Sequence, residues 1–174
     1  MKKTIIALFV LAIGISGCAT VQSIIKSSFP YTATLTIPST AKEGEVLSIK
    51  SAASSFDEVF GNQNAADYVK DVKIASAKLI ASKPSDQSMG MFKSVKLFIS
   101  SGDSEEVMVA SRSDVAENIP SNLVLDIDNS RFLDNYIKGK NLTIRMEYVL
   151  RNSITSDVNV RTSLSFSSSP NTKK

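Results

Sequence analysis

Hydrophobic and polar residues alternate along most of the chain beyond residue 30. In the first such stretch Tyr31, Ala33, Leu35 and Ile37 share one parity, and three threonines separate them. Because successive side chains of a β-strand point to opposite faces, this alternation predicts a strand with one buried face. Seven later stretches repeat the pattern, so the sequence predicts eight strands: 31–37, 47–49, 72–82, 95–99, 107–109, 123–127, 142–148 and 158–166.

Two local features refine this pattern. The turn residues Ser101, Gly102 and Asp103 separate the fourth and fifth predicted strands, which predicts a hairpin. Within 72–82 the parity of the apolar residues changes, and one extra residue in the strand would cause such a change. We therefore expect a β-bulge near Ser76.

Two stretches have helical spacing instead. Residues 55–58 read Ser-Phe-Asp-Glu, the form of a capping box, and Phe56, Val59 and Phe60 follow the i, i+3, i+4 rule. Residues 130–138 carry an apolar stripe formed by Phe132, Leu133, Tyr136 and Ile137. We expect a short helix in each stretch, at the ends of the β domain.

Strands at intervals of about 8 to 12 residues, with turn residues between them, are typical of two packed antiparallel sheets. The sequence thus predicts an all-β domain over residues 31–167, a sandwich of seven to eight strands with one or two short helices. The small polar residues 168–174 predict a disordered tail.

The N-terminus has the features of an export signal. Lys2 and Lys3 precede an apolar run from Ile5 to Ile15, which is shorter than the roughly 20 residues that a membrane-spanning helix needs. Later hydrophobic stretches are interrupted by charged residues. We therefore assign residues 1–17 to a signal peptide and exclude them from the fold.

The sequence Ile15-Ser16-Gly17-Cys18 resembles the lipobox of bacterial lipoproteins. The resemblance implies that Cys18 becomes the first mature residue and carries diacylglycerol and a further fatty acyl chain such as palmitate. Two or three chains hold a protein durably on a membrane, whereas one chain does so only marginally. Residues 18–30 would then form a lipidated tether. The alternative is a conventional secretory signal in which the cysteine is incidental.

The overall charge gives no indication of a nucleic-acid partner. The formal charge of +3 includes Lys2 and Lys3, so loss of the signal leaves 18 basic residues against 17 acidic ones, a charge of +1. The remaining lysines are interspersed with acids, whereas nucleic-acid binding requires a clustered basic surface.

The residue inventory excludes several kinds of catalysis. The chain has no histidine and no tryptophan, and Cys18 is its only cysteine. Without histidine there is no Ser-His-Asp triad and no imidazole ligand for zinc, and one cysteine excludes an internal disulfide. We expect no cofactor, no metal site and no enzymatic activity.

Two groups of acids are candidate sites. Asp126 and Asp128 lie two apart on a predicted strand with Asn129 next, an oxygen-rich arrangement that could bind calcium but lacks the glycine and distal glutamate of a calcium loop. Solvated strand faces commonly carry such acids. Asp103, Glu105 and Glu106 lie at the predicted hairpin tip, where charge discourages edge pairing and where a catalytic carboxylate pair would need a cleft.

Serine and methionine motifs were the other candidates. The hydroxyls of Ser111-Arg112-Ser113-Asp114 lack an activating base, and the Ser-x-x-Lys match of Ser23 and Lys26 falls in the tether. Met89, Met91 and Phe92 form an apolar loop. They could make an exposed contact surface, but we expect them to fill one end of the sandwich.

The later half of the chain resembles small lipid-anchored proteins of the Bacteroidota. The resemblance is carried by residues 92–100 (FKSVKLFIS), 106–111 (EVMVAS) and 133–138 (LDNYIK). It implies an immunoglobulin-like sandwich and no catalytic residue. Acids just after the cysteine accompany surface export in that group, but this chain reads ATVQS there. That departure favours the periplasmic face of the outer membrane.

These features predict a non-enzymatic binding or structural module of the cell envelope, held at a membrane by acylated Cys18. Its partners would be membrane lipid and an envelope protein or glycan. The alternative is a histidine-free hydrolase that uses carboxylates, or an accessory protein of glycan processing. The absence of tryptophan weakens the carbohydrate versions of both, because sugars commonly stack on aromatic faces.

Overall fold

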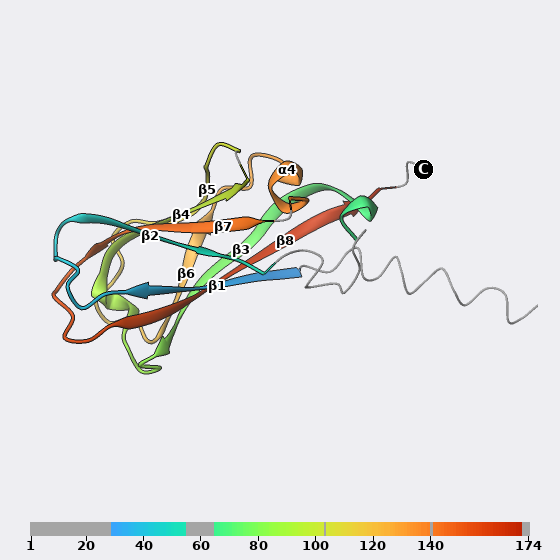
Figure 1. Cartoon of the computed structure of the whole chain (residues 1–174). Coiled ribbons are helices and arrows are strands. Elements are labelled where there is room, and N and C mark those ends of the chain that lie inside the picture. The colour runs from blue at the N-terminus through green and yellow to red at the C-terminus, as the bar shows by residue number, and fades with distance from the viewer. Residues whose placement is uncertain (1–28, 55–64, 103, 140, 172–174) are drawn as a thin grey trace, which may run out of the picture.

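The computed structural model describes residues 29–54, 65–102, 104–139 and 141–171. Eight strands account for most of these residues (Figure 1). They are β1 (Phe29–Ile37), β2 (Val46–Ala52), β3 (Val69–Lys83), β4 (Phe92–Ser101), β5 (Val107–Arg112), β6 (Asn122–Ile127), β7 (Leu142–Leu150) and β8 (Val158–Pro170). The all-β class predicted from the alternation is confirmed.

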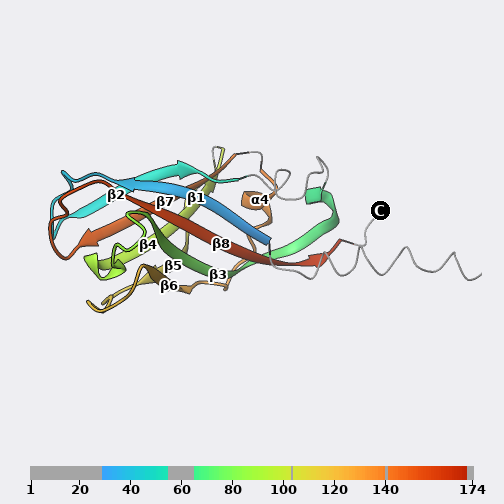
Figure 2. The same ribbon diagram turned by 90° about the horizontal axis from the view of Figure 1, so that it is seen from below.

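The strands form one antiparallel sheet in the order β1-β8-β3-β6-β5-β4-β7-β2. Its two end strands, β1 and β2, lie side by side, as Figures 1 and 2 show together, and the N–H of Ser54 donates to the carbonyl of Thr32 at 3.2 Å. The sheet therefore nearly closes on itself. We expected two separate sheets, but β5 and β6 join the halves through the pairs Ala110–Ile127 and Ser111–Asp126.

The alternation of the sequence becomes the alternation of burial. The nine residues of β7 alternate between buried and half-buried. In β1 every second residue from Tyr31 to Ile37 is buried. The buried side chains form one core. Within it, the ring centres of Tyr31 and Phe166 are 5.4 Å apart in an edge-on contact, and those of Phe92 and Tyr148 are 5.8 Å apart. Burial raises the pKa of the Tyr148 hydroxyl.

The predicted hairpin and bulge are both present. β4 pairs with β5 across the turn after Ser101, and the register of β3 against β8 shifts between Ile74 and Ser76. A second shift in β3 lies between Lys70 and Lys73, where Asp71 has a φ of 54°. Such shifts let a long strand change which side chains face the core.

The helix expected over residues 130–138 is shorter than its spacing predicted. Within 130–138 the helix α4 covers only Asp134–Ile137, with Leu133 and Ile137 buried. The helix expected around Phe56 lies outside the described residues. Two 3₁₀ turns that the sequence did not predict are η2 (Ala65–Tyr68) and η3 (Met89–Met91). Among the described residues, no helix has the length and apolar character to cross a bilayer.

The strands extend beyond the predicted domain limits. β1 begins at Phe29, two residues early, and β8 continues to Pro170, where residues 168–170 were expected to be disordered. The last residues of β8 pair with Val69 and Lys70 at the start of β3. Main-chain pairing of this kind needs no apolar side chains, which explains why the serine-rich composition gave the wrong expectation there. Cys18 and the signal segment lie outside the described residues.

Candidate functional site

Four strand connections meet at one end of the sheet, at the left of Figure 1. Because neighbouring strands run in opposite directions, the β1–β2, β3–β4, β5–β6 and β7–β8 connections all lie at the same end. These connections comprise residues 38–45, 84–91, 113–121 and 151–157. The start of β1 and the end of β8 lie at the opposite end.

A cleft of about 550 Å³ lies among three of these connections. Its walls are mostly hydroxyl and amide groups, and Glu117 and Arg151 are the charged residues of the described lining. The lining residues are Gln87, Ser88, Gly90, Met91, Glu117, Arg151, Asn152, Ser153, Ile154, Thr155 and Ser156. The volume falls in the usual range of ligand pockets, but the lining is more polar than most.

Arg151 holds the cleft together. It follows the last residue of β7, and its N–H donates to the carbonyl of Met91 at 2.7 Å. Its guanidinium donates to the carbonyls of Gly90 and Val115 and contacts the Glu117 carboxylate at 3.3 Å. One side chain thus joins three connections. Because its guanidinium is engaged by these acceptors, Arg151 has a structural role in the cleft.

Ser88 and Gly90 bind the β3–β4 connection tightly to the β5–β6 connection. The Ser88 hydroxyl donates to the carbonyl of Ile119 at 2.6 Å and accepts from the N–H of Gly90 at 3.0 Å. Gly90 approaches the main chain of Glu117 so closely that a Cβ atom there would overlap it. This is a close approach that only glycine permits.

Glu43 ties the β1–β2 connection to the same end. Its carboxylate accepts from the N–H of Ser153 at 3.0 Å and from the Ser153 hydroxyl at 3.1 Å. By contrast, the side chains of Asn152, Thr155 and Ser156 are exposed and bind no other described residue. These three residues therefore present hydrogen-bonding groups to whatever occupies the cleft.

The two candidate calcium ligands have separate protein partners. Asp126 makes a two-pronged ion pair with Arg112, at 3.0 and 3.1 Å. Asp128 accepts from the hydroxyl of Ser130 at 2.6 Å and from its N–H at 3.1 Å, and these bonds lower the pKa of the Asp128 carboxyl. Within the described part of the chain, no group of three or more potential ligands could hold a metal.

Two of the other sequence candidates, Glu106 and Arg112, form ion pairs. Glu106 pairs with Arg145, Glu105 is exposed, and Asp103 lies outside the described residues. Arg112 is paired as described, and Asp114 has a φ of 51° in the turn after β5. Ser23 and Lys26 lie outside the described residues. The described residues among these candidates do not line the cleft.

Met89, Met91 and Phe92 fill the end of the fold, as expected. Met89 and Phe92 are fully buried and Met91 is 7% exposed. The exposed contact surface that we considered for these three residues is therefore wrong. Met91 also lines the cleft, and η3 places Gly90 between the two methionines.

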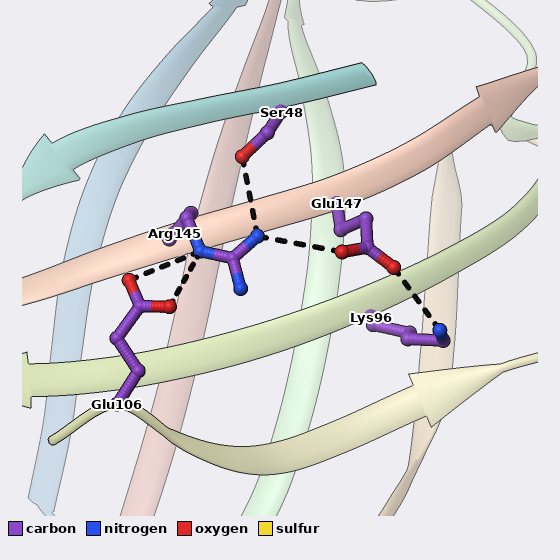
Figure 3. Close-up of polar contacts among 5 residues, drawn as sticks. All are labelled: Ser48, Lys96, Glu106, Arg145 and Glu147. Atoms are coloured by element: carbon purple, nitrogen blue, oxygen red, sulfur yellow. Dashed lines mark hydrogen bonds and ion pairs between the residues drawn. The ribbon is translucent and has the colours of Figure 1, made fainter. Parts of the chain in front are cut away.

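A charged network that the sequence did not indicate covers the outer face of β2, β7 and β4 (Figure 3). Arg145 contacts Glu106 at 2.8 Å, Ser48 at 3.2 Å and Glu147 at 3.5 Å, and its guanidinium lies 4.0 Å from the centre of the Phe98 ring. Lys96 donates to Glu147 at 3.0 Å. The only sequence signal was a charge at an outward position of a predicted strand.

The charges of the network compensate one another. The hydrogen bond from Lys96 is the largest effect on the Glu147 carboxyl, and it lowers the pKa of that group. Arg145 lowers the pKa further, while burial has a smaller, opposing effect than the Lys96 hydrogen bond. Each charged group of Figure 3 has a partner of opposite sign. The arrangement suits a stabilised surface, whereas the cleft leaves polar groups free for a ligand.

Comparison with known proteins leaves the family open. No family model matches the chain, and no curated protein matches it. A chain from Desmodium yellow mottle tymovirus is similar among solved structures, with a TM-score of 0.30 and 12% identity over 85% of this chain and 84% of that one.

Proposed function

We propose that this protein is a non-enzymatic binding module of the bacterial cell envelope, held at a membrane by acylated Cys18. The cleft between the connections would bind a polar segment of another envelope protein. The observation that carries the proposal is the position of the cleft, at the end of the sheet opposite the start of β1. A tether entering at Phe29 would leave the cleft facing away from the bilayer.

The length of the sheet supports this orientation. β1 has nine residues, from Phe29 to Ile37. At about 3.4 Å per residue, the two ends of β1 are about 27 Å apart. The residues after Ile37 belong to the cleft end, so a ligand there would be clear of the headgroups.

The lining favours binding over hydrolysis. A carboxylate hydrolase needs two carboxyl groups facing one another across the substrate. Among the described lining residues Glu117 is the one carboxylate, and it forms an ion pair with Arg151. The exposed Asn152, Thr155 and Ser156 suit main-chain groups of a peptide. The described lining includes no aromatic residue on which a sugar could stack, so we rank a glycan second.

The anchor and location are part of the same proposal. The lipobox-like sequence before Cys18 supports acylation, and the absence of acids in residues 19–23 supports the periplasmic face of the outer membrane. The resemblance to Bacteroidota lipoproteins belongs here as well. Mass spectrometry of the mature N-terminus tests the anchor, since an unacylated Cys18 or a first residue of Ala19 contradicts it.

We also propose that the fold is an immunoglobulin-like sandwich joined along one edge. The link between β5 and β6 consists of two residue pairs, whereas β4 and β7 pair along nearly their whole length. This difference supports a division into a β1-β8-β3-β6 half and a β5-β4-β7-β2 half around one core. An experimental structure with continuous β5–β6 pairing would contradict the division.

Site-specific photocrosslinking in living cells tests the binding role. A photoreactive residue at Thr155 should capture a defined envelope protein, and one at Arg161, exposed on β8, should not. Once that partner is purified, the combined changes Asn152→Ala, Thr155→Ala and Ser156→Ala should weaken its binding about tenfold or more, which corresponds to the loss of one or two hydrogen bonds. Equal capture from both positions, or unchanged affinity, refutes the proposal.

A further inference from the structure

Two aromatic side chains are exposed at the end of the molecule opposite the cleft. Tyr68 is 49% exposed and Phe132 is 59% exposed. The other large apolar side chains exposed in the described part of the chain are the aliphatic Val46, Met108 and Val124. Exposed aromatic rings at one end of a fold are a candidate contact surface.

Contacts around the start of β3 bring these two residues to the same end. The carbonyl of Tyr68 accepts from the N–H of Asn171 just after β8. The N–H of Leu133, which follows Phe132, donates to the carbonyl of Val72 at 2.7 Å. The ammonium of Lys73 lies 4.8 Å from the centre of the Phe132 ring. We call Tyr68, Lys70, Lys73, Arg131 and Phe132 the N-terminal face.

The start of β1 belongs to this end. Phe29 pairs with Phe166, and four residues later β8 ends at Pro170, which pairs with Val69. The chain therefore enters the sheet beside the N-terminal face, and Figure 1 shows η2, α4 and the end of β8 gathered there.

The length of the tether determines what this face meets. Ten residues, 19–28, separate Cys18 from Phe29. Even fully extended they span at most about 36 Å. If Cys18 is acylated, as proposed above, the start of β1, which lies beside the N-terminal face, stays within that reach of the bilayer surface.

We infer that the N-terminal face docks on the bilayer that holds Cys18, with Tyr68 and Phe132 inserted to the boundary between the headgroups and the acyl chains. Aromatic rings favour this interfacial zone, and lysines beside them can reach lipid phosphates. Lys70, Lys73 and Arg131 supply such cations. The docking fixes the orientation of the domain and points the cleft outward. It rests on the proposed anchor.

Aromatic insertion, not net charge, drives this docking. Asp67 and Asp71 are exposed at the same end and offset part of the basic charge. The Asp134 carboxylate accepts a hydrogen bond from the N–H of Val72 at 3.0 Å and forms an ion pair with Lys138 at 3.5 Å. We therefore expect docking to depend weakly on salt and strongly on the two rings.

The chain contains no tryptophan, so a single introduced tryptophan reports its own surroundings. Protein carrying Phe132→Trp, expressed from the full chain and purified after export and processing, would be reconstituted in vesicles of phosphatidylethanolamine and phosphatidylglycerol whose acyl chains carry bromine. The matched control is Val124→Trp, because Val124 is 61% exposed on β6, away from this face. Flotation of the vesicles measures anchoring, and quenching by bromine measures insertion.

We expect both variants to float, with Phe132→Trp losing about half or more of its fluorescence and Val124→Trp almost none, since only an inserted ring lies near the acyl chains. Equal, weak quenching of two floating variants overturns the docking and leaves the anchor intact. Failure of both variants to float refutes the anchor and the inference with it. Should Phe132→Trp unfold, Tyr68→Trp gives the same comparison at the second exposed ring.

Discussion

Gly90 lies directly against the main chain of Glu117, with no room for a side chain between them. A Cβ atom at position 90 would overlap the carbonyl group of Glu117, a backbone group that cannot swing aside. This contact fixes the spacing of the β3–β4 and β5–β6 connections, and with it the shape of the cleft between them. Gly90 is thus required for a close contact, whereas Gly44 is required for a positive φ.

Gly90→Ala should destabilise the protein by about 2 kcal/mol or more, because the new methyl group forces the two connections apart. Gly44→Ala is the matched control, since Gly44 has open space around its Cβ position but a φ of 73°. That change should cost about 1 kcal/mol through backbone strain alone. Urea denaturation measures both values, and a smaller loss for Gly90→Ala than for Gly44→Ala would contradict the packing argument.

Arg151→Met should lower the free energy of unfolding by about 2 kcal/mol, because it leaves the carbonyls of Gly90 and Val115 and the Glu117 carboxylate without their donor. Arg151→Lys should recover only part of the loss, since an ammonium lacks the rigid fork of five N–H donors that a guanidinium offers. Arg161→Met, at an exposed position of β8, should leave stability nearly unchanged. Equal effects at positions 151 and 161 in denaturant titrations would show that the contacts of Arg151 contribute nothing.

Thr162→Val should stabilise the protein by about 1 kcal/mol. The Thr162 hydroxyl is fully buried and has no hydrogen-bond partner among the described residues, so a methyl group of similar size removes a desolvation cost. Thr36→Val on the neighbouring strand should act in the opposite direction, because the Thr36 hydroxyl donates to Asn159 at 2.8 Å. Thermal unfolding compares the two variants, and a lower melting temperature for Thr162→Val would count against the prediction.

Glu147→Gln should flatten the loss of stability in acid. The folded protein holds the pKa of Glu147 below its ordinary value of 4.5, so ionised Glu147 contributes stability above that pH. The contribution disappears as the pH falls through the folded-state pKa. The wild-type protein should therefore lose more stability below pH 4.5 than the variant.

A change at Lys96, the hydrogen-bond partner of Glu147, tests the same acid dependence. Lys96→Met removes the hydrogen bond that lowers the pKa of Glu147 most, so it should also reduce the acid dependence. Denaturant titrations at neutral and acid pH give the slopes. Parallel pH profiles for all three proteins would mean that the network of Figure 3 does not affect folding.

The sequence alone determined the elements whose signal is local. All eight predicted strands are present, because each carries its own period-two pattern, as the alternation of burial along β7 shows. The bulge near Ser76 was readable because a parity change leaves a mark within one strand. The burial of Met89 and Phe92 followed from their apolar character.

The tertiary structure decided everything that depends on which strands become neighbours. Pairing of β5 with β6 joined the halves into one sheet, and pairing of β8 with β3 ordered residues 168–170, although neither is encoded in local periodicity. The cleft arises because three connections distant in sequence meet at one end, where Arg151 finds acceptors on residues 90, 115 and 117. Side-chain alternation specifies a strand and its buried face, but the partners along its edges are chosen by main-chain hydrogen bonds that every residue offers alike.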